Sequence, residues 1–133
     1  LRMAFEVGEG AHALLTTPGA TRWYFSRGIT AQLQQVGTVA DGGCLEWLPQ
    51  ETLIFSGAHA RLLTRIELEG NARFCGWEIL GLGRPALGEP FRDGAIDFRI
   101  ELPVLAVDAG FYAFTSDSFN RLSPETTRSR FLE

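Results

Sequence analysis

Short runs of alternating apolar and polar residues, separated by turns rich in acidic residues and glycine, most strongly constrain how this chain can fold. Segments 11–16, 29–34 and 65–69 each alternate with a period of two, which is the side-chain period of a β-strand. Turn-forming sequences such as Gly8-Glu9-Gly10 and Ala40-Asp41-Gly42-Gly43 stand between such runs. No window keeps a helical stripe for three turns. The pattern therefore predicts strands throughout, with little helix.

A faint internal repeat links three of the turns. Segment 7–15 resembles segment 39–47 and, less closely, segment 68–74. Turns at a fixed period suggest strands stacked in layers, as in a β-solenoid. Acidic-glycine turns also close the hairpins of ordinary β-proteins, so a hairpin arrangement stays open. We predict an all-β fold of layered, β-helix-like or solenoid-like stacked strands.

Length and composition exclude several classes of protein. A chain of 133 residues is one modest domain. Its net charge of −4 gives no electrostatic footprint for nucleic acid, and it has no apolar run long enough to span a membrane. All twelve basic residues are arginine, which excludes Schiff-base and P-loop lysine chemistry. Two cysteines and two histidines cannot build a four-ligand zinc finger at the usual spacing.

The two cysteines and the N-terminus bear on the compartment. Cys44 and Cys75 have no disulfide framework around them, so a cytosolic protein with two reduced thiols is the simplest account. They stand at matching places in successive layers of the predicted stack, where we expect them to be small core fillers. The N-terminal segment 1–7 is too short and too charged to be a signal peptide. It reads as the middle of a strand, so we expect upstream residues to be missing.

Three distinctive motifs point to a family. They are Thr17-Pro18-Gly19-Ala20, Trp47-Leu48-Pro49-Gln50-Glu51 and Leu82-Gly83-Arg84-Pro85-Ala86-Leu87-Gly88-Glu89. In this order and spacing they resemble the UreD family of urease accessory proteins, also called UreH. The match runs from about residue 1 to about residue 102. We therefore predict a core UreD-like domain over 1–102 that lacks N-terminal strands of the full protein. Residues 103–133 would be a degenerate or truncated C-terminal portion.

The resemblance implies a function without catalysis. Members of the family act in the cytosol in a complex that loads nickel into urease. They bind apo-urease on one side and UreF on the other, and UreF carries the GTPase UreG, which supplies the nickel. The family fold is all-β with β-helix-like layers, and a passage through it is thought to conduct nickel. The resemblance implies a transient nickel ion, no organic cofactor, and neither nucleic-acid nor membrane partners. A Gly-Gly-Asp stretch that the family carries before the first strand is absent here.

Three carboxylates are candidates for the nickel relay. The resemblance gives Glu78 this role, because the family has an acidic residue implicated in nickel handling there. A carboxylate among apolar neighbours is costly to bury unless it is paired or ligating, although Glu78 could also lie on a polar surface face. Glu46 and Glu51 flank a bend and could be transient oxygen ligands or wall charges. Exposed carboxylates beside a bend are, however, commoner than functional ones. His12 and His59 have no ligand spacing.

Four further residues are candidates for a partner interface or a structural turn. Arg84 is flanked by Gly83 and Pro85, and its guanidinium can fork onto a carboxylate of this chain or of a partner. Arg22 and Arg27 bracket aromatic residues that include Tyr24. Arginine beside aromatic side chains is a common interface composition. A core aromatic cluster with solvated arginine ends is an equal alternative.

Two other functions are compatible with the sequence. A β-solenoid carbohydrate-active enzyme could use paired carboxylates drawn from Glu46, Glu51 and Glu78, with tryptophan side chains that stack on sugars. A purely structural partner-binding β-domain would use no metal at all. The specific motifs favour the accessory protein, which passes a metal along and performs no chemistry on a substrate.

Overall fold

The computed structural model describes residues 1–103 and 109–115, which form ten strands and one short 3-10 helix. No helix in these ranges is long and apolar enough to cross a membrane. The strands are β1 (Arg2–Val7), β2 (His12–Leu15), β3 (Thr21–Trp23), β4 (Ala31–Val39), β5 (Cys44–Trp47), β6 (Thr52–Ile54), β7 (His59–Leu68), β8 (Arg73–Leu82), β9 (Ala95–Glu101) and β10 (Ala109–Thr115), and the helix η1 is Pro85–Leu87. Most of the predicted C-terminal portion, residues 104–108 and 116–133, lies outside the described residues.

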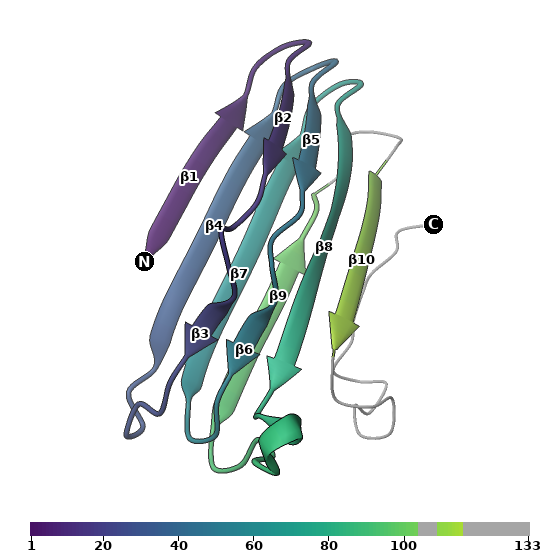
Figure 1. Cartoon of the computed structure of the whole chain (residues 1–133). Coiled ribbons are helices and arrows are strands. Elements are labelled where there is room, and N and C mark those ends of the chain that lie inside the picture. The colour runs from purple at the N-terminus through teal and green to yellow at the C-terminus, as the bar shows by residue number, and fades with distance from the viewer. Residues whose placement is uncertain (104–108, 116–133) are drawn as a thin grey trace.

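The strands form two parallel sheets that face each other. The first sheet has the order β1-β4-β7-β9. The second has the order β2-β5-β8-β6-β3, with β10 also paired to β8. Figure 1 shows the two sheets as layers whose strands run in opposite directions. The chain crosses repeatedly from one layer to the other, and each strand of the first sheet pairs with a strand about thirty residues away in the sequence.

The predicted fold class, an all-β stack of solenoid-like layers, is wrong. Every pair of named strands is parallel, and the pairs divide between two sheets of four and six strands. In the second sheet β8 pairs with both β5 and β6, so the layers are not equivalent repeating units, as a solenoid requires. All-parallel sheets are typical of α/β proteins. This architecture is α/β-like in its sheets but has almost no helix in the described residues. The hairpin alternative is also wrong, because no named strands pair antiparallel.

The three acidic-glycine turns do lie side by side. Val7 pairs with Val39, and Val39 pairs with Leu68, so the strands that lead into the turns end at one level. Asp41 links the three turns through two hydrogen bonds. Its backbone carbonyl accepts one from the N–H of Gly10, and its side-chain Oδ1 accepts one from the N–H of Asn71. Each turn carries the chain from the first sheet to the second.

Two prolines explain why the second sheet is interrupted. Pro18 separates β2 from β3, and Pro49 separates β5 from β6. Proline has no N–H to give to a ladder of hydrogen bonds, so a central strand tends to break there. The third strand in this position, β8, has no proline and continues unbroken for ten residues. The middle of β8 therefore lies beside the irregular link between β5 and β6.

The core between the sheets has two apolar clusters. The first cluster lies near the acidic-glycine turns and includes Val39, Leu45, Trp47, Ile66 and Phe74. The second lies toward the other end and includes Ile54, Ala58, Ala60, Leu62 and Leu80. Along β7, Thr64 stands between Leu62 and Ile66, and along β8, Glu78 stands between Phe74 and Leu80. Buried polar side chains therefore separate the two clusters.

Candidate functional site

Glu78 lies in the interior of the molecule. Only 5% of the residue is exposed, and its side chain points from β8 toward the first sheet. Trp47 Nε1, on neighbouring β5, donates a hydrogen bond to Glu78 Oε1 at 3.0 Å. The expectation that a carboxylate here needs a partner is thus met by an indole N–H, and the alternative of a surface carboxylate is wrong.

A second contact joins Glu78 to the first sheet. Thr64 Oγ1, on β7, lies 3.5 Å from Glu78 Oε1 and 2.9 Å from Oε1 of Gln35 on β4. A hydroxyl has one hydrogen, so Thr64 donates to Gln35 or to Glu78 and not to both at once, and the shorter distance favours Gln35. The contacts form a chain of three buried polar side chains, Glu78, Thr64 and Gln35, which we call the polar belt.

The surroundings of Glu78 favour its protonated form. Burial raises the pKa of the Glu78 carboxyl above its ordinary value, and the hydrogen bonds from Trp47 and Thr64 oppose this only in part. The cause is desolvation, which disfavours the charged form of a carboxylate. No arginine or histidine forms an ion pair with Glu78 among the described residues. Glu78 therefore loses its proton at a higher pH than an exposed glutamate does.

The position of Glu78 follows from the local sequence. Trp47 pairs with Gly76, and Thr52 pairs with Leu80, so the irregular link around Pro49 faces the segment that contains Glu78. Trp77 Nε1 donates to the carbonyl oxygen of Pro49 at 3.0 Å and fixes this link to β8. Trp77 thus lies on the outward face, and alternation turns Glu78 inward.

The structure does not bring the three predicted carboxylates together. Glu46 lies on the outward face of β5, in register with Cys75, while Glu78 points inward from β8. Glu51 lies in the link between β5 and β6, where its backbone carbonyl accepts a hydrogen bond from Thr21. The carboxylate pair required by a glycosidase is therefore not assembled from Glu46 and Glu78. No group of three or more His, Cys, Asp or Glu side chains that could hold a metal ion occurs in the described ranges.

The sequence predicted the positions of the histidines and cysteines only in part. His12 is exposed, as expected for a histidine without ligand spacing, and its Nε2 lies 2.6 Å from Glu46 Oε1. Cys44 pairs with Arg73 and not with Cys75, so the predicted matching places are wrong. Cys75 is exposed and Cys44 is half-buried, which corrects the prediction of core fillers.

The predicted partner-interface residues gather at the end of the molecule where β3 and β6 end. The ring centroids of Tyr24 and Phe55 lie 5.1 Å apart, edge to face. The guanidinium carbon of Arg84 lies 5.1 Å from the Phe55 ring centroid, and Arg84 Nε donates to Glu89 Oε2 at 2.6 Å. The carboxylate partner of Arg84 is therefore internal. Arg22 and Arg27 are exposed.

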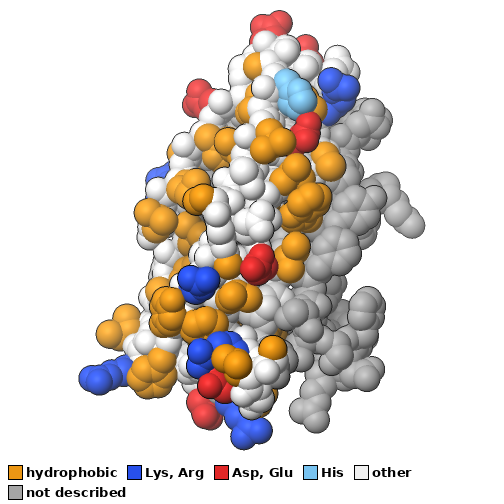
Figure 2. Space-filling model, viewed as in Figure 1, with side chains coloured by type: hydrophobic (Ala, Val, Ile, Leu, Met, Phe, Trp, Pro, Cys, Tyr) orange, Lys and Arg blue, Asp and Glu red, His pale blue; other side chains and the backbone are white. Residues whose placement is uncertain are grey.

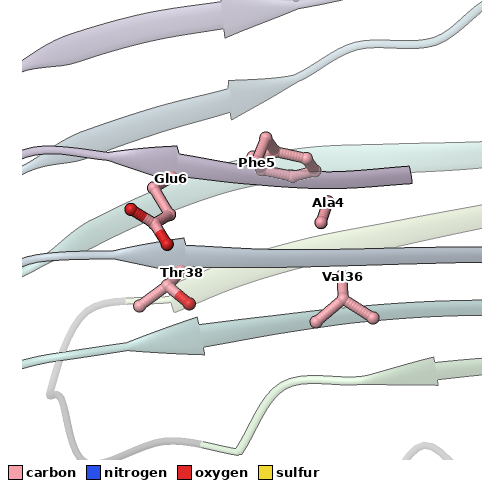
Figure 3. Close-up of a pocket in the computed structure, with 5 residues that line it drawn as sticks. All are labelled: Ala4, Phe5, Glu6, Val36 and Thr38. Carbon is pink, nitrogen blue, oxygen red and sulfur yellow. The ribbon is translucent and has the colours of Figure 1, made fainter. Parts of the chain in front are cut away.

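A shallow depression on the first sheet is separate from Glu78. Figure 3 shows its lining residues, with Glu6 pointing toward Thr38 from β1, and Ala4 and Val36 beside them. Glu6 pairs with Thr38 and Ala4 with Val36, on the outward face of β1 and β4. The polar belt lies on the opposite face of that sheet. With a single carboxylate and no other ionisable side chain, the depression offers no catalytic or metal-binding set.

The sequence alone did not identify the partners of Glu78. Trp47, Thr64 and Gln35 lie 31, 14 and 43 residues from it along the chain, and none belongs to a recognisable motif with it. One signal was available: Gln35 and Thr64 are polar, whereas the other buried positions of their strands are apolar or glycine. Polar residues at such positions need a buried partner.

Comparisons with known proteins identify what the chain is similar to. The model of the UreD urease accessory protein family matches residues 1–111. Proteins named Urease accessory protein UreD from Dechloromonas aromatica and Alcanivorax borkumensis are each 50% identical to this chain over 102 residues, which is 77% of this chain and 35% of each relative. One of the same name from Pseudomonas fluorescens is 49% identical over 102 residues, covering 77% of this chain and 36% of that protein. The chain spans about a third of the length of these relatives.

Proposed function

The chain belongs to the UreD family of urease accessory proteins, and on that basis we propose that it scaffolds apo-urease with UreF and UreG and relays nickel to the urease active site. In this proposal the protein is not an enzyme, and nickel is its cargo. It works in the cytosol. The buried carboxylate of Glu78 is the one structural observation that carries the relay.

The proposal rests on the energetic cost of Glu78. A buried carboxylate without a charged partner reduces stability, and an apolar or amide side chain would avoid that cost. Hydrogen bonds from Trp47 and Thr64 orient Glu78 but do not neutralise it. A group that is costly to keep and is placed between two apolar clusters fits a role outside folding.

The chemistry of Glu78 suits brief binding. A metal ion binds the deprotonated carboxylate, and burial raises the pKa of Glu78, so protons compete with nickel here more strongly than at an exposed glutamate. This competition weakens the affinity, and weak affinity permits transfer. The oxygen atoms of Thr64 and Gln35 could complete a second contact as the ion passes, because neutral oxygen donors bind divalent ions loosely.

Glu46 and Glu51 have a different place in the proposal. Glu46 lies on the outward face beside His12, and Glu51 lies in the link next to Pro49. If they act in the relay, they act as surface oxygen ligands before or after Glu78 and not as members of one site. Ligands that an ion meets one at a time fit a relay better than a cage.

The test is reconstitution with purified partners. The chain is mixed with UreF, with UreF and UreG, and with apo-urease, and each mixture is separated by size-exclusion chromatography. Urease activity is then measured after nickel addition, with and without this protein. We expect co-elution with UreF and with apo-urease, and activity that depends on the chain. The proposal would be overturned if the chain co-eluted with neither UreF nor apo-urease and urease were fully activated without the chain.

A further inference from the structure

An exposed surface at one end of the molecule has the composition of a docking site. It consists of Tyr24, Phe25, Phe55, Arg84 and Leu87, which we call the aromatic–arginine patch. Tyr24 packs edge to face on Phe55, and Arg84 lies over the same ring. Three segments that are distant in the sequence therefore build one continuous surface.

The patch is exposed although it is largely apolar. Tyr24 is 61% exposed, Phe25 66% and Leu87 67%. Figure 2 shows hydrophobic and arginine side chains gathered together at this end of the molecule. Soluble monomers rarely leave large contiguous apolar surface in water, and such surface commonly marks an interaction site.

The loops that carry the patch are held in place before any partner arrives. Phe25 lies against Gly57, where any side chain would collide with its ring. Gly83 has a φ of +71°, and its neighbour Arg84 forms backbone hydrogen bonds with Glu89 that close the loop. Since these groups are already ordered, binding costs little conformational entropy.

Three arginines that form no ion pair among the described residues lie in or beside the segments that form the patch. Arg22 and Arg27 flank Tyr24 and Phe25 in the sequence. The backbone carbonyl of Arg92 accepts hydrogen bonds from Ser56 and Gly57, which directly follow Phe55. All three are exposed, and none has an ion pair in the part of the chain that the structure describes, unlike Arg61, Arg65, Arg84 and Arg99. Asp93 is the exposed carboxylate nearest to them in sequence.

We propose that the aromatic–arginine patch docks a protein segment that presents apolar side chains flanked by aspartate or glutamate. The charge argues for this partner, because free cations are concentrated here in a chain whose net charge is −4. Tyrosine and arginine at the centre of an interface contribute most of its binding energy, and surrounding charges set the association rate and the choice of partner. The inference rests on the proposed function only for the proteins used as first probes.

The test compares charge reversal at two ends of the molecule. UreF and apo-urease are titrated separately against the unsubstituted chain, the R22E/R27E variant and the Y24A variant. Arg73→Glu is the matched control, because Arg73 is exposed, has no ion pair in the described structure and lies at the start of β8, at the other end. Thermal unfolding verifies that each variant is folded.

We expect R22E/R27E to weaken binding of at least one probe by about tenfold or more and to reduce its dependence on salt. Y24A should weaken the same interaction, and Arg73→Glu should change it less than about twofold. Binding that is equally tight in R22E/R27E and Y24A would overturn the inference while leaving the proposed function intact.

A second measurement covers the case in which neither protein binds the unsubstituted chain, which would count against the proposed function. Two synthetic peptides of equal length are then titrated, one alternating glutamate with leucine and phenylalanine, the other with lysine in place of glutamate. Binding of the acidic peptide alone, lost in R22E/R27E, supports the inference. Equal binding of both peptides, or binding of neither, overturns it.

Discussion

Trp47 and Glu78 face each other from neighbouring strands, and the indole N–H of one donates to the buried carboxyl of the other at 3.0 Å. Trp47 also stacks on Phe5, with ring centroids 5.7 Å apart and planes inclined by 9°. Trp47 therefore packs in the apolar core and also donates a hydrogen bond to the polar belt. This double role makes the belt and the packing around it testable separately.

Replacing Glu78 with glutamine should make the stability of the protein less dependent on pH. Burial raises the pKa of Glu78 above its ordinary value of 4.5, so the folded state keeps a proton that the unfolded state has lost. Stability should fall as the pH rises from about 4.5 to the folded pKa and stay reduced above it. Urea unfolding between pH 4 and pH 8 measures this.

The matched control for that experiment is Glu9→Gln, which removes a carboxylate from an exposed turn. Glu78→Gln should be more stable than the unsubstituted chain at pH 7, because glutamine avoids the cost of burying or protonating the carboxylate on folding. Equal stability of Glu78→Gln and the parent at both pH 5 and pH 8 would contradict the account.

Replacing Trp47 with phenylalanine should reduce the free energy of unfolding by about 1–3 kcal/mol. The aromatic ring would remain beside Phe5, but Glu78 would lose its N–H donor. The double variant W47F/E78L should be less destabilised than the sum of the two single variants, because both polar partners are removed together. Additive losses in urea unfolding would show that the hydrogen bond does not couple the two residues.

Replacing Gly37 with alanine should destabilise the protein by about 1–3 kcal/mol. The added methyl group would collide with the Phe5 ring and push it from Trp47. Gly8→Ala is the control, because a methyl group there meets no atom within 4 Å. A cost for Gly37→Ala within about 0.5 kcal/mol of the Gly8→Ala cost would show that Phe5 can move freely.

The sequence predicted the strands better than their pairing. Alternation located the segments around residues 11–16, 29–34 and 65–69, because inward and outward side chains differ on each strand. Pairing could not be predicted in the same way, since an acidic-glycine turn looks the same whether it closes a hairpin or leads to another sheet. The repeat aligned Val7 with Val39 and Leu68 correctly. It could not show that β8 continues where Pro49 breaks its neighbour.

The burial of Glu78 could likewise not be predicted from the local sequence. Both Trp77 and Ile79 are apolar, so the pattern of β8 favours placing them inside and the carboxylate outside. In the structure Trp77 and Ile79 are only half-buried on the outward face, and Trp77 binds the carbonyl of Pro49. The inward direction of Glu78 is set by contacts across two sheets, which no short motif records.

The most direct measurement of the central claim is urease activation by the Glu78→Gln variant. Purified apo-urease, UreF, UreG, GTP and nickel are combined with the unsubstituted chain, with Glu78→Gln or with Glu9→Gln, after each has been shown to be folded. We expect activation with Glu78→Gln to fall close to the level without the chain, and Glu9→Gln to activate urease fully. Normal activation by a folded Glu78→Gln protein would show that Glu78 is not part of the nickel relay.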